Sequence, residues 1–170
     1  MSKELPGAAY SWAKKFGEGL PATCVQALAY AYGRVNGRVD VNAFMLPALI
    51  SRELTLTAAG GVQQDTIQLG TALMVTSVSC RIFLDNAADD TSMVGLQLQL
   101  PNNQGLLVGD PGTNFNASLL AENATWLPLL IPWVLFPSDQ TTFTGTPSAG
   151  LAGTAEVAFG LQGVSIYGLI

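Results

Sequence analysis

The chain of 170 residues contains no histidine. Ser-His-Asp and Cys-His catalytic arrangements and histidine-ligated metal sites are therefore excluded. The two cysteines, Cys24 and Cys80, make neither a disulfide framework nor a CxxC metal or redox pair. Neither a Walker A sequence nor a dinucleotide-binding GxGxxG occurs. These absences remove the commonest enzyme signatures, and we expect a protein that is not an enzyme, with no catalytic residue, cofactor or metal.

Charge is also scarce, because Asp, Glu, Lys and Arg make up 11% of the chain, whereas roughly 25% is typical of soluble domains. The mean hydropathy is nevertheless positive, at +0.35. Ser, Thr, Asn and Gln must supply most of the polar surface. Since large apolar patches are uncommon on soluble monomers, we expect part of the surface to contact other protein.

The few charges are unevenly distributed. Residues 1–52 contain six of the seven basic residues and three of the twelve acidic ones, so this part is net basic and the rest net acidic. Six cations spread over so long a segment predict no nucleic-acid binding, which needs many phosphate contacts. The most apolar run, Leu127–Pro137, is too short and too proline-rich to cross a bilayer, so no membrane partner is expected.

The acidic cluster of Asp85, Asp89 and Asp90 is the one candidate for a Ca²⁺ site. Its spacing does not match an EF-hand loop. Asp and Asn favour turns because they hydrogen-bond to the local backbone, and the favoured interpretation is a solvated turn between strands.

The first forty residues have helical periodicity. Ala9, Trp12, Ala13 and Phe16 recur at i, i+3, i+4 and i+7, with Lys14 and Lys15 on the other side. A second helix is predicted over residues 21–33, and Asn36-Gly37 predicts a tight hairpin. We expect residues 1–45 to form an arm with one or two short helices.

From about Arg52 the apolar period changes to two, which is typical of half-buried strands. In residues 72–85 the side chains of Met74, Val78, Cys80, Ile82 and Leu84 are expected to share one buried face. In the closing strand the apolar parity changes from Phe159 and Leu161 to Val164 and Ile166, which predicts a β-bulge at Gln162-Gly163. Because no helix alternates with these strands, residues 46–170 are expected to form an antiparallel β-sandwich of the jelly-roll or Greek-key type.

Seven residues are candidate contact sites. On the arm, Trp12, Lys14, Lys15 and Phe16 are expected to bind a partner, although the two lysines are equally explained as the solvated side of a docked helix. On the sandwich, Trp126, Trp133 and Tyr167 are candidates for an oligomer or surface contact. Both tryptophans are expected in the core or at a subunit contact, where the indole N–H finds a partner. The alternative is that Trp12, Trp126 and Trp133 line a sugar-binding face.

Three segments of the β-region resemble the small jelly-roll structural proteins of tailed-bacteriophage virions, including capsid decoration or cement proteins. They are DNAADDTSMVGLQLQLPNNQGLLVGD from Asp85, LPLLIPWVLFPSDQTTFTG from Leu127 and AEVAFGLQGVSIYG from Ala155. The resemblance implies a non-enzymatic virion protein that binds and stabilises a capsid. It adds no catalytic residues, and the helical basic arm departs from a bare jelly roll.

We therefore expect a capsid decoration or cement protein, made in the host cytoplasm and located in the virion. Its partners would be the major capsid protein or another virion protein and further copies of itself, with a trimer favoured and the arm as anchor. The alternative is a carbohydrate- or host-surface-binding β-sandwich module, such as a head fibre or tail component. An unrecognised enzyme would need a pocket with convergent carboxylates.

Overall fold

The computed structural model describes residues 6–57, 59–84, 94–99, 106–108, 115–116, 126–148, 150–151 and 153–169. Two helices, α1 (Pro6–Phe16) and α2 (Ala22–Arg34), precede the strands. All strand pairs are antiparallel. The chain is thus mostly β with a short helical N-terminal segment, as its sequence predicts.

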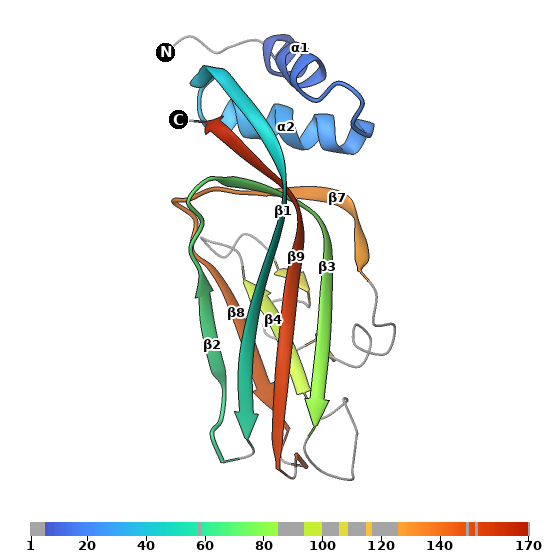
Figure 1. The fold of residues 1–170 in the computed structure, drawn as a ribbon, viewed down its shortest axis with the longest axis vertical. Coiled ribbons are helices and arrows are strands. Elements are labelled where there is room, and N and C mark those ends of the chain that lie inside the picture. Colours follow the sequence, from blue (N-terminus) through green and yellow to red (C-terminus); the bar gives the residue numbers. More distant parts are fainter. Residues whose placement is uncertain are drawn as a thin grey trace.

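The strands form two sheets (Figure 1). Sheet A has the order β1-β9-β3-β7, with β1 at Val39–Thr57, β9 at Thr154–Leu169, β3 at Ala72–Leu84 and β7 at Leu127–Leu135. Sheet B has the order β2-β8-β4-β5, with β2 at Gln63–Ile67, β8 at Thr141–Pro147, β4 at Val94–Gln99 and β5 at Leu106–Val108. The two-residue strand β6 (Phe115–Asn116) pairs with β4.

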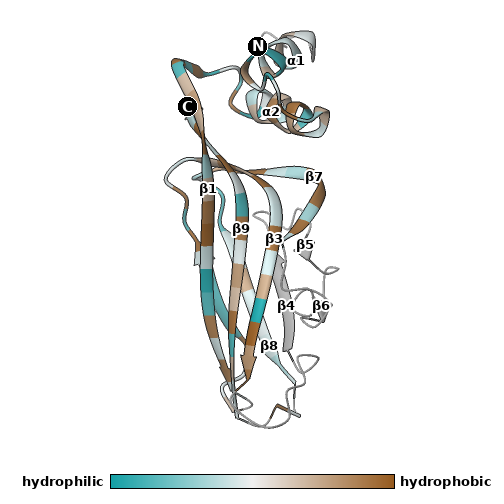
Figure 2. Cartoon of the chain, turned by 45° about the vertical axis from the view of Figure 1, so that its right-hand side comes forward, coloured by the Kyte–Doolittle hydropathy of each residue, from teal (hydrophilic) through white to brown (hydrophobic). Residues whose placement is uncertain are grey.

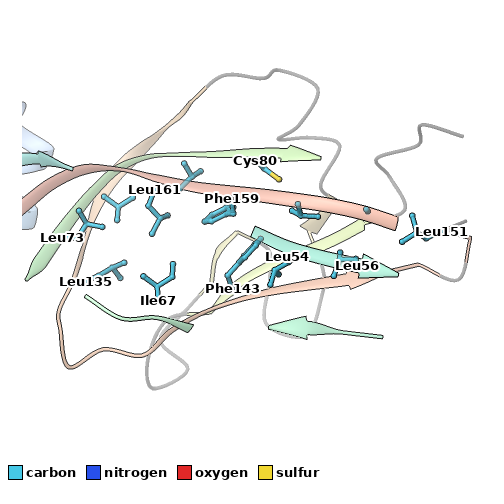
Figure 3. Packing of buried hydrophobic residues seen from close by; sticks show 14 residues of the cluster. Leu54, Leu56, Ile67, Leu73, Cys80, Leu135, Phe143, Leu151, Phe159 and Leu161 are labelled. Atoms are coloured by element: carbon cyan, nitrogen blue, oxygen red, sulfur yellow. The ribbon is translucent and has the colours of Figure 1, made fainter. Parts of the chain in front are cut away.

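One cluster of buried side chains joins the two sheets (Figure 3). Phe143 of β8 stacks on Phe159 of β9, with ring centroids 4.6 Å apart. Leu56, Leu161 and Cys80 from sheet A lie in the same cluster and are at most 1% exposed. Cys80 is therefore a core residue, as its alternation with polar neighbours predicts.

The two helices lie at one end of the long strands, where β1 begins and β9 ends (Figure 1). A second buried cluster fills the space between them and sheet A. Leu28 and Ala31 of α2 are fully buried there against Met74 of β3 and Ile166 of β9. Because this contact buries apolar side chains on both sides, removing the helices would expose one face of sheet A to water.

The bulge between β3 and β9 lies in β3 rather than in β9. The pairing of β3 with β9 shifts between Val75 and Ser77, whereas β9 pairs with β1 without interruption from Thr154 to Tyr167. The extra residue is Thr76, whose hydroxyl donates to the carbonyl oxygen of Gln162 over 3.3 Å.

The β-bulge predicted at Gln162-Gly163 of β9 is therefore wrong. Val164 and Ile166 lie on the outer face of sheet A and are apolar because α2 covers that face. Met74 likewise faces the helices, while Val78 and Cys80, beyond the bulge, face sheet B. A bulge in the neighbouring strand and a helix over one face together produce the pattern that looks like a bulge in β9.

Asn36-Gly37 ends α2 instead of turning a hairpin. Both residues have left-handed backbone angles, with φ of 52° and 73°. The amide of Gly37 donates to the carbonyl oxygen of Tyr32 over 2.9 Å, which satisfies a carbonyl of the last helical turn. Strand β1 then begins at Val39, so the end of the expected arm is already part of sheet A.

Candidate binding surfaces

The two aromatic arm residues lie together on one side of α1. Trp12 stacks on Phe16 with ring centroids 4.7 Å apart and lies 5.0 Å from the ring of Tyr32 on α2. This stacking follows from the i, i+4 spacing of the two aromatic residues on one helix. Lys14 and Lys15 are exposed. A shallow groove of about 440 Å³ is lined by Trp12, Lys15, Phe16, Ala43 and Met45, so it lies between α1 and the first part of β1.

Trp126 precedes β7 and lies on the outer face of sheet A. A Cβ added to Gly160 of β9 would come within 2.7 Å of both the Trp126 ring and the Ser79 hydroxyl. Because Gly160 has no side chain, the indole ring of Trp126 can occupy this space. Trp126 is 37% exposed, so one side of the ring contacts the sheet and part of it remains accessible.

Trp133 lies on β7 at a cavity between α2 and that strand. The cavity has a volume of about 280 Å³. Gln26, Tyr30 and Arg34, four residues apart along α2, form one wall, and the segment from Ile131 to Leu135 forms the other. Its lining combines aromatic and aliphatic side chains with a single ion pair, which is typical of a small-ligand site.

That ion pair joins Arg34 of α2 to Asp139 in the turn between β7 and β8. The guanidinium donates to both carboxylate oxygens, and the Nη1–Oδ2 distance is 2.9 Å. Asp139 also accepts a 3.0 Å hydrogen bond from the amide of Phe136, and the guanidinium lies 4.4 Å from the centre of the Phe136 ring. The hydrogen bond with Asp139 raises the pKa of Arg34 above its usual value. The Arg34–Asp139 ion pair therefore stabilises the contact between α2 and the end of sheet A.

Tyr167 of β9 lies at the same end of the molecule, directly opposite Phe44 of β1. The two rings stack, with centroids 4.7 Å apart and planes 7° from parallel. Phe44 remains 49% exposed, so the stacked pair presents an aromatic surface to solvent.

Large apolar side chains are exposed along both outer strands of sheet A, and Figure 2 shows hydrophobic segments on β1 and on β7. On β1, Phe44, Leu46 and Leu49 are 49%, 48% and 66% exposed, and we name them the β1 edge patch. On β7, Leu127, Leu130 and Ile131 are 50%, 92% and 75% exposed, and we name them the β7 edge patch.

Neither cysteine is placed for nucleophilic chemistry. Burial raises the pKa of Cys80 to about 12, and burial also raises the pKa of Cys24. Both thiols are therefore protonated near neutral pH, and the thiolate is the reactive form.

Within the described ranges, no three His, Cys, Asp or Glu side chains come together as a metal site would require. In the same part of the chain, neither helix is long and apolar enough to cross a membrane. Asp85, Asp89 and Asp90, the candidate Ca²⁺ ligands, lie outside the described residues.

The structure brings together some predicted contact residues and separates others. Trp12 and Phe16 form one surface, whereas Trp126, Trp133 and Tyr167 lie at three different places. Sequence reasoning missed Arg34, Asp139 and the β1 edge patch. The strand order that makes β1 and β7 outer strands depends on contacts between residues far apart in the sequence, which no local pattern encodes. The two prolines within Leu127–Leu135 predict an edge or bent strand, since proline is confined to sheet edges and bulges, and β7 is an outer strand of sheet A.

Comparison of the chain with protein-family models, with curated proteins and with solved structures finds no match in any of the three.

Proposed function

We propose that the two sheets form a β-sandwich of the jelly-roll type. A jelly roll arises when a long antiparallel hairpin of eight strands is rolled up, so that the first strand pairs with the last, the second with the next to last, and so on. The pairs β1–β9, β2–β8, β3–β7 and β4–β5 follow that scheme. The pairs β9–β3 and β8–β4 are those that rolling adds.

On this fold we propose a non-enzymatic structural protein of a virion, which decorates and stabilises a capsid as a homo-oligomer. Jelly rolls are common in viral capsids, although that analogy does not by itself determine function. The observation that carries the proposal is the exposure of the β1 and β7 edge patches. Apolar side chains with so large an exposed fraction are uncommon on soluble monomers. Their exposure favours an oligomer, in which these side chains contact other copies of the protein, over a monomer, in which they contact water.

The helical segment is the proposed anchor to the shell. Lys15 lines the groove formed with Trp12 and Phe16, and Lys14 is exposed next to it in the sequence, so a cation and aromatic rings lie on one surface. A partner with acidic side chains around an apolar contact would complement it. Since the helices also bury the end of sheet A, this role is best tested by surface substitutions rather than by deletion.

The test of the proposed function is a binding assay with particles. Particles produced without this gene are mixed with the purified chain and sedimented. The proposal predicts binding that saturates at a fixed number of copies per particle, because a shell lattice offers a fixed number of sites. Binding that does not saturate, or no cosedimentation at all, would contradict it.

The cavity beside Trp133 favours a second candidate, a carbohydrate-binding module. Tyr30 and Trp133 offer aromatic surfaces, and Gln26 and Arg34 offer hydrogen-bond donors around one small space. Binding to defined glycans that is lost in Trp133→Ala but kept in Trp126→Ala would favour this candidate over the capsid protein.

A further inference from the structure

The outer face of sheet A, further along the strands than the helices, carries polar side chains from three neighbouring strands. The helices cover the end of the sheet at which β1 begins (Figure 1). Beyond that end, alternate residues of β1, β9 and β3 point into the cluster between the two sheets, so the residues between them point outward. We name these outward residues the polar face: the odd-numbered residues from Leu49 to Thr55, the even-numbered residues from Glu156 to Gln162, and the odd-numbered residues from Ser77 to Phe83.

The Trp126 side chain extends across the polar face. Trp126 comes directly before β7, next to Leu127, which is paired with Val78 of β3. A Cβ on Gly160 of β9 would nonetheless come within 2.7 Å of the Trp126 ring. Because β3 lies between β7 and β9, the side chain crosses β3 and lies along the sheet. One face of the indole ring therefore packs on the sheet, and the other is open to a ligand, in agreement with its 37% exposure.

Hydrogen-bonding side chains surround this ring. Ser51 of β1 is paired with Gly160, and Gln162 lies two residues from Gly160 on β9. The hydroxyl of Ser77 donates to the amide oxygen of Gln162 over 3.1 Å, which orients the amide with its N–H groups away from Ser77. Glu53 lies two residues beyond Ser51 on the same face, and Ser51, Gln162 and Glu53 are all exposed. A hydroxyl, an amide and a carboxylate thus offer both donors and acceptors beside the ring.

A second aromatic side chain lies further along the polar face. Phe83 of β3 is 58% exposed. It is four residues from Ser79, whose hydroxyl lies against Gly160 beside the Trp126 ring. Four residues of a strand span about 14 Å. A ligand that contacts both aromatic side chains is therefore longer than one six-membered ring and follows the direction of the strands.

This combination of groups favours one class of ligand. A pyranose sugar has C–H groups on its ring faces, which pack on an aromatic ring, and hydroxyl groups at its edge, which need both donors and acceptors. An aliphatic surface of another protein would leave the hydrogen-bonding groups around Trp126 without partners. Nucleic-acid bases also stack on tryptophan, but Glu53 and Glu156 outnumber Arg81 on the polar face, and this charge opposes phosphates. The groups present therefore fit a neutral oligosaccharide.

We propose that the polar face of sheet A binds a neutral oligosaccharide, with one sugar ring stacked on Trp126. Gln162, Ser51 and Glu53 hydrogen-bond to the sugar hydroxyls, and Phe83 contacts a further sugar of the same chain. The site goes beyond the proposed role in a virion and does not depend on it. It is also separate from the cavity between α2 and β7, which is lined by other residues.

Affinity electrophoresis of the full-length chain tests this site, in native gels that contain a soluble neutral glucan, mannan or xylan. The wild type is expected to be retarded by at least one of them, and calorimetry with the matching oligosaccharide then gives the affinity. Trp126→Ala should weaken the affinity roughly tenfold or more, because the stacking surface is lost, and Trp126→Phe should weaken it less. Gln162→Ala and Glu53→Ala should each weaken it about threefold, because each removes a hydrogen bond.

Val62→Ser is the control, because Val62 is 53% exposed and precedes β2 of sheet B, away from the polar face. It should bind as the wild type does. Since Trp126 packs on Gly160, thermal unfolding checks that its variants retain the fold. Gln162 and Glu53 are exposed, and their substitution tests the site independently of that packing.

Failure of all three polysaccharides to retard the wild type would overturn the proposal. Equal affinities of the wild type and Trp126→Ala would overturn it too. Binding that is lost in Trp133→Ala and kept in Trp126→Ala would place the glycan in the cavity between α2 and β7 instead. Retardation by a single-stranded oligonucleotide and by no polysaccharide would assign the polar face to nucleic acid. The particle assay contains no added glycan, so a chain that binds particles but no polysaccharide would retain the proposed function and lose only this site.

Discussion

Arg34 on α2 donates hydrogen bonds to both carboxylate oxygens of Asp139, 105 residues further along the chain. The Asp139 side chain is only 4% exposed. Arg34→Ala would leave a buried carboxylate without its counter-charge, although the amide of Phe136 still donates to it. We expect the free energy of unfolding to fall by about 2–3 kcal/mol, below the 3–5 kcal/mol typical of fully buried pairs because Arg34 is partly solvated. Chemical denaturation measures the loss.

The control for this prediction is the second ion pair, Arg52 with Asp65, whose side chains are 36% and 40% exposed. Water and salt screen such a pair, so Arg52→Ala is expected to change stability by less than ~1 kcal/mol. Equal effects of the two substitutions would show that the Arg34–Asp139 pair does not fasten the helices to the sheet.

Gly163 of β9 lies directly against the bulged part of β3. A Cβ at this position would lie 1.9 Å from the carbonyl oxygen of Met74 and 3.0 Å from the Cα of Val75. Because these are backbone atoms, Gly163→Ala must move the strand, and we expect a loss of about 3 kcal/mol or more in the free energy of unfolding.

A glycine in open space provides the comparison for Gly163. Gly33 on α2 has nothing within 4 Å of its added Cβ. Gly33→Ala should therefore stabilise the chain by about 0.5–1 kcal/mol, because alanine loses less backbone entropy in a helix. A tolerated Gly163→Ala would mean that the strands do not approach this closely.

Stability at alkaline pH should depend on Cys80. Its pKa in the folded chain is about 12, against 9.0 for an unperturbed thiol. The pKa of Cys80 is higher in the folded chain than in the unfolded chain. The protonated thiol therefore contributes fully to the free energy of unfolding below pH 9, and this contribution is lost as the pH rises toward 12. At pH 11 the loss is about 2–3 kcal/mol.

Denaturation of the wild type and of Cys80→Val at neutral and alkaline pH tests this dependence. The variant should lose less stability than the wild type over the same interval. Identical pH profiles would show that the folded chain does not hold the Cys80 proton more tightly than the unfolded chain.

The sequence predicts the strand periodicity, the helices and the buried Cys80, because these depend on residues close together in the chain. The sequence does not predict which face of a strand is buried where that face is covered by an element distant in the sequence. Val164 and Ile166 are apolar because α2 covers them, and Met74 faces away from Cys80 because Thr76 is an extra residue. The β1 edge patch was missed for the same reason, since an exposed leucine and a buried one look alike until the sheet order is known.

The proposed anchor predicts a charge dependence of particle binding. Reversing Lys14 and Lys15 to Glu removes two exposed cations without touching a buried side chain. We expect at least a tenfold weaker affinity for particles at low salt, and a smaller difference between variant and wild type at high salt, where surface charges are screened. Cosedimentation across a salt series measures both effects.

Arg81→Glu, at an exposed residue of β3, is the control away from the helices for the single reversal Lys15→Glu, because each changes the net charge equally. It should bind as the wild type does. If this variant weakens binding as much as the single lysine reversal, the effect comes from net charge and the helices are not the anchor.

The most direct test of the proposed place in a virion is the number of copies of this chain in purified native particles, measured by quantitative mass spectrometry against the major shell protein. Because a decoration protein occupies repeated lattice sites, we expect a fixed ratio to the shell protein that survives repeated purification. A chain found only in the particle-free fraction, or at a ratio that falls with each purification step, would contradict it.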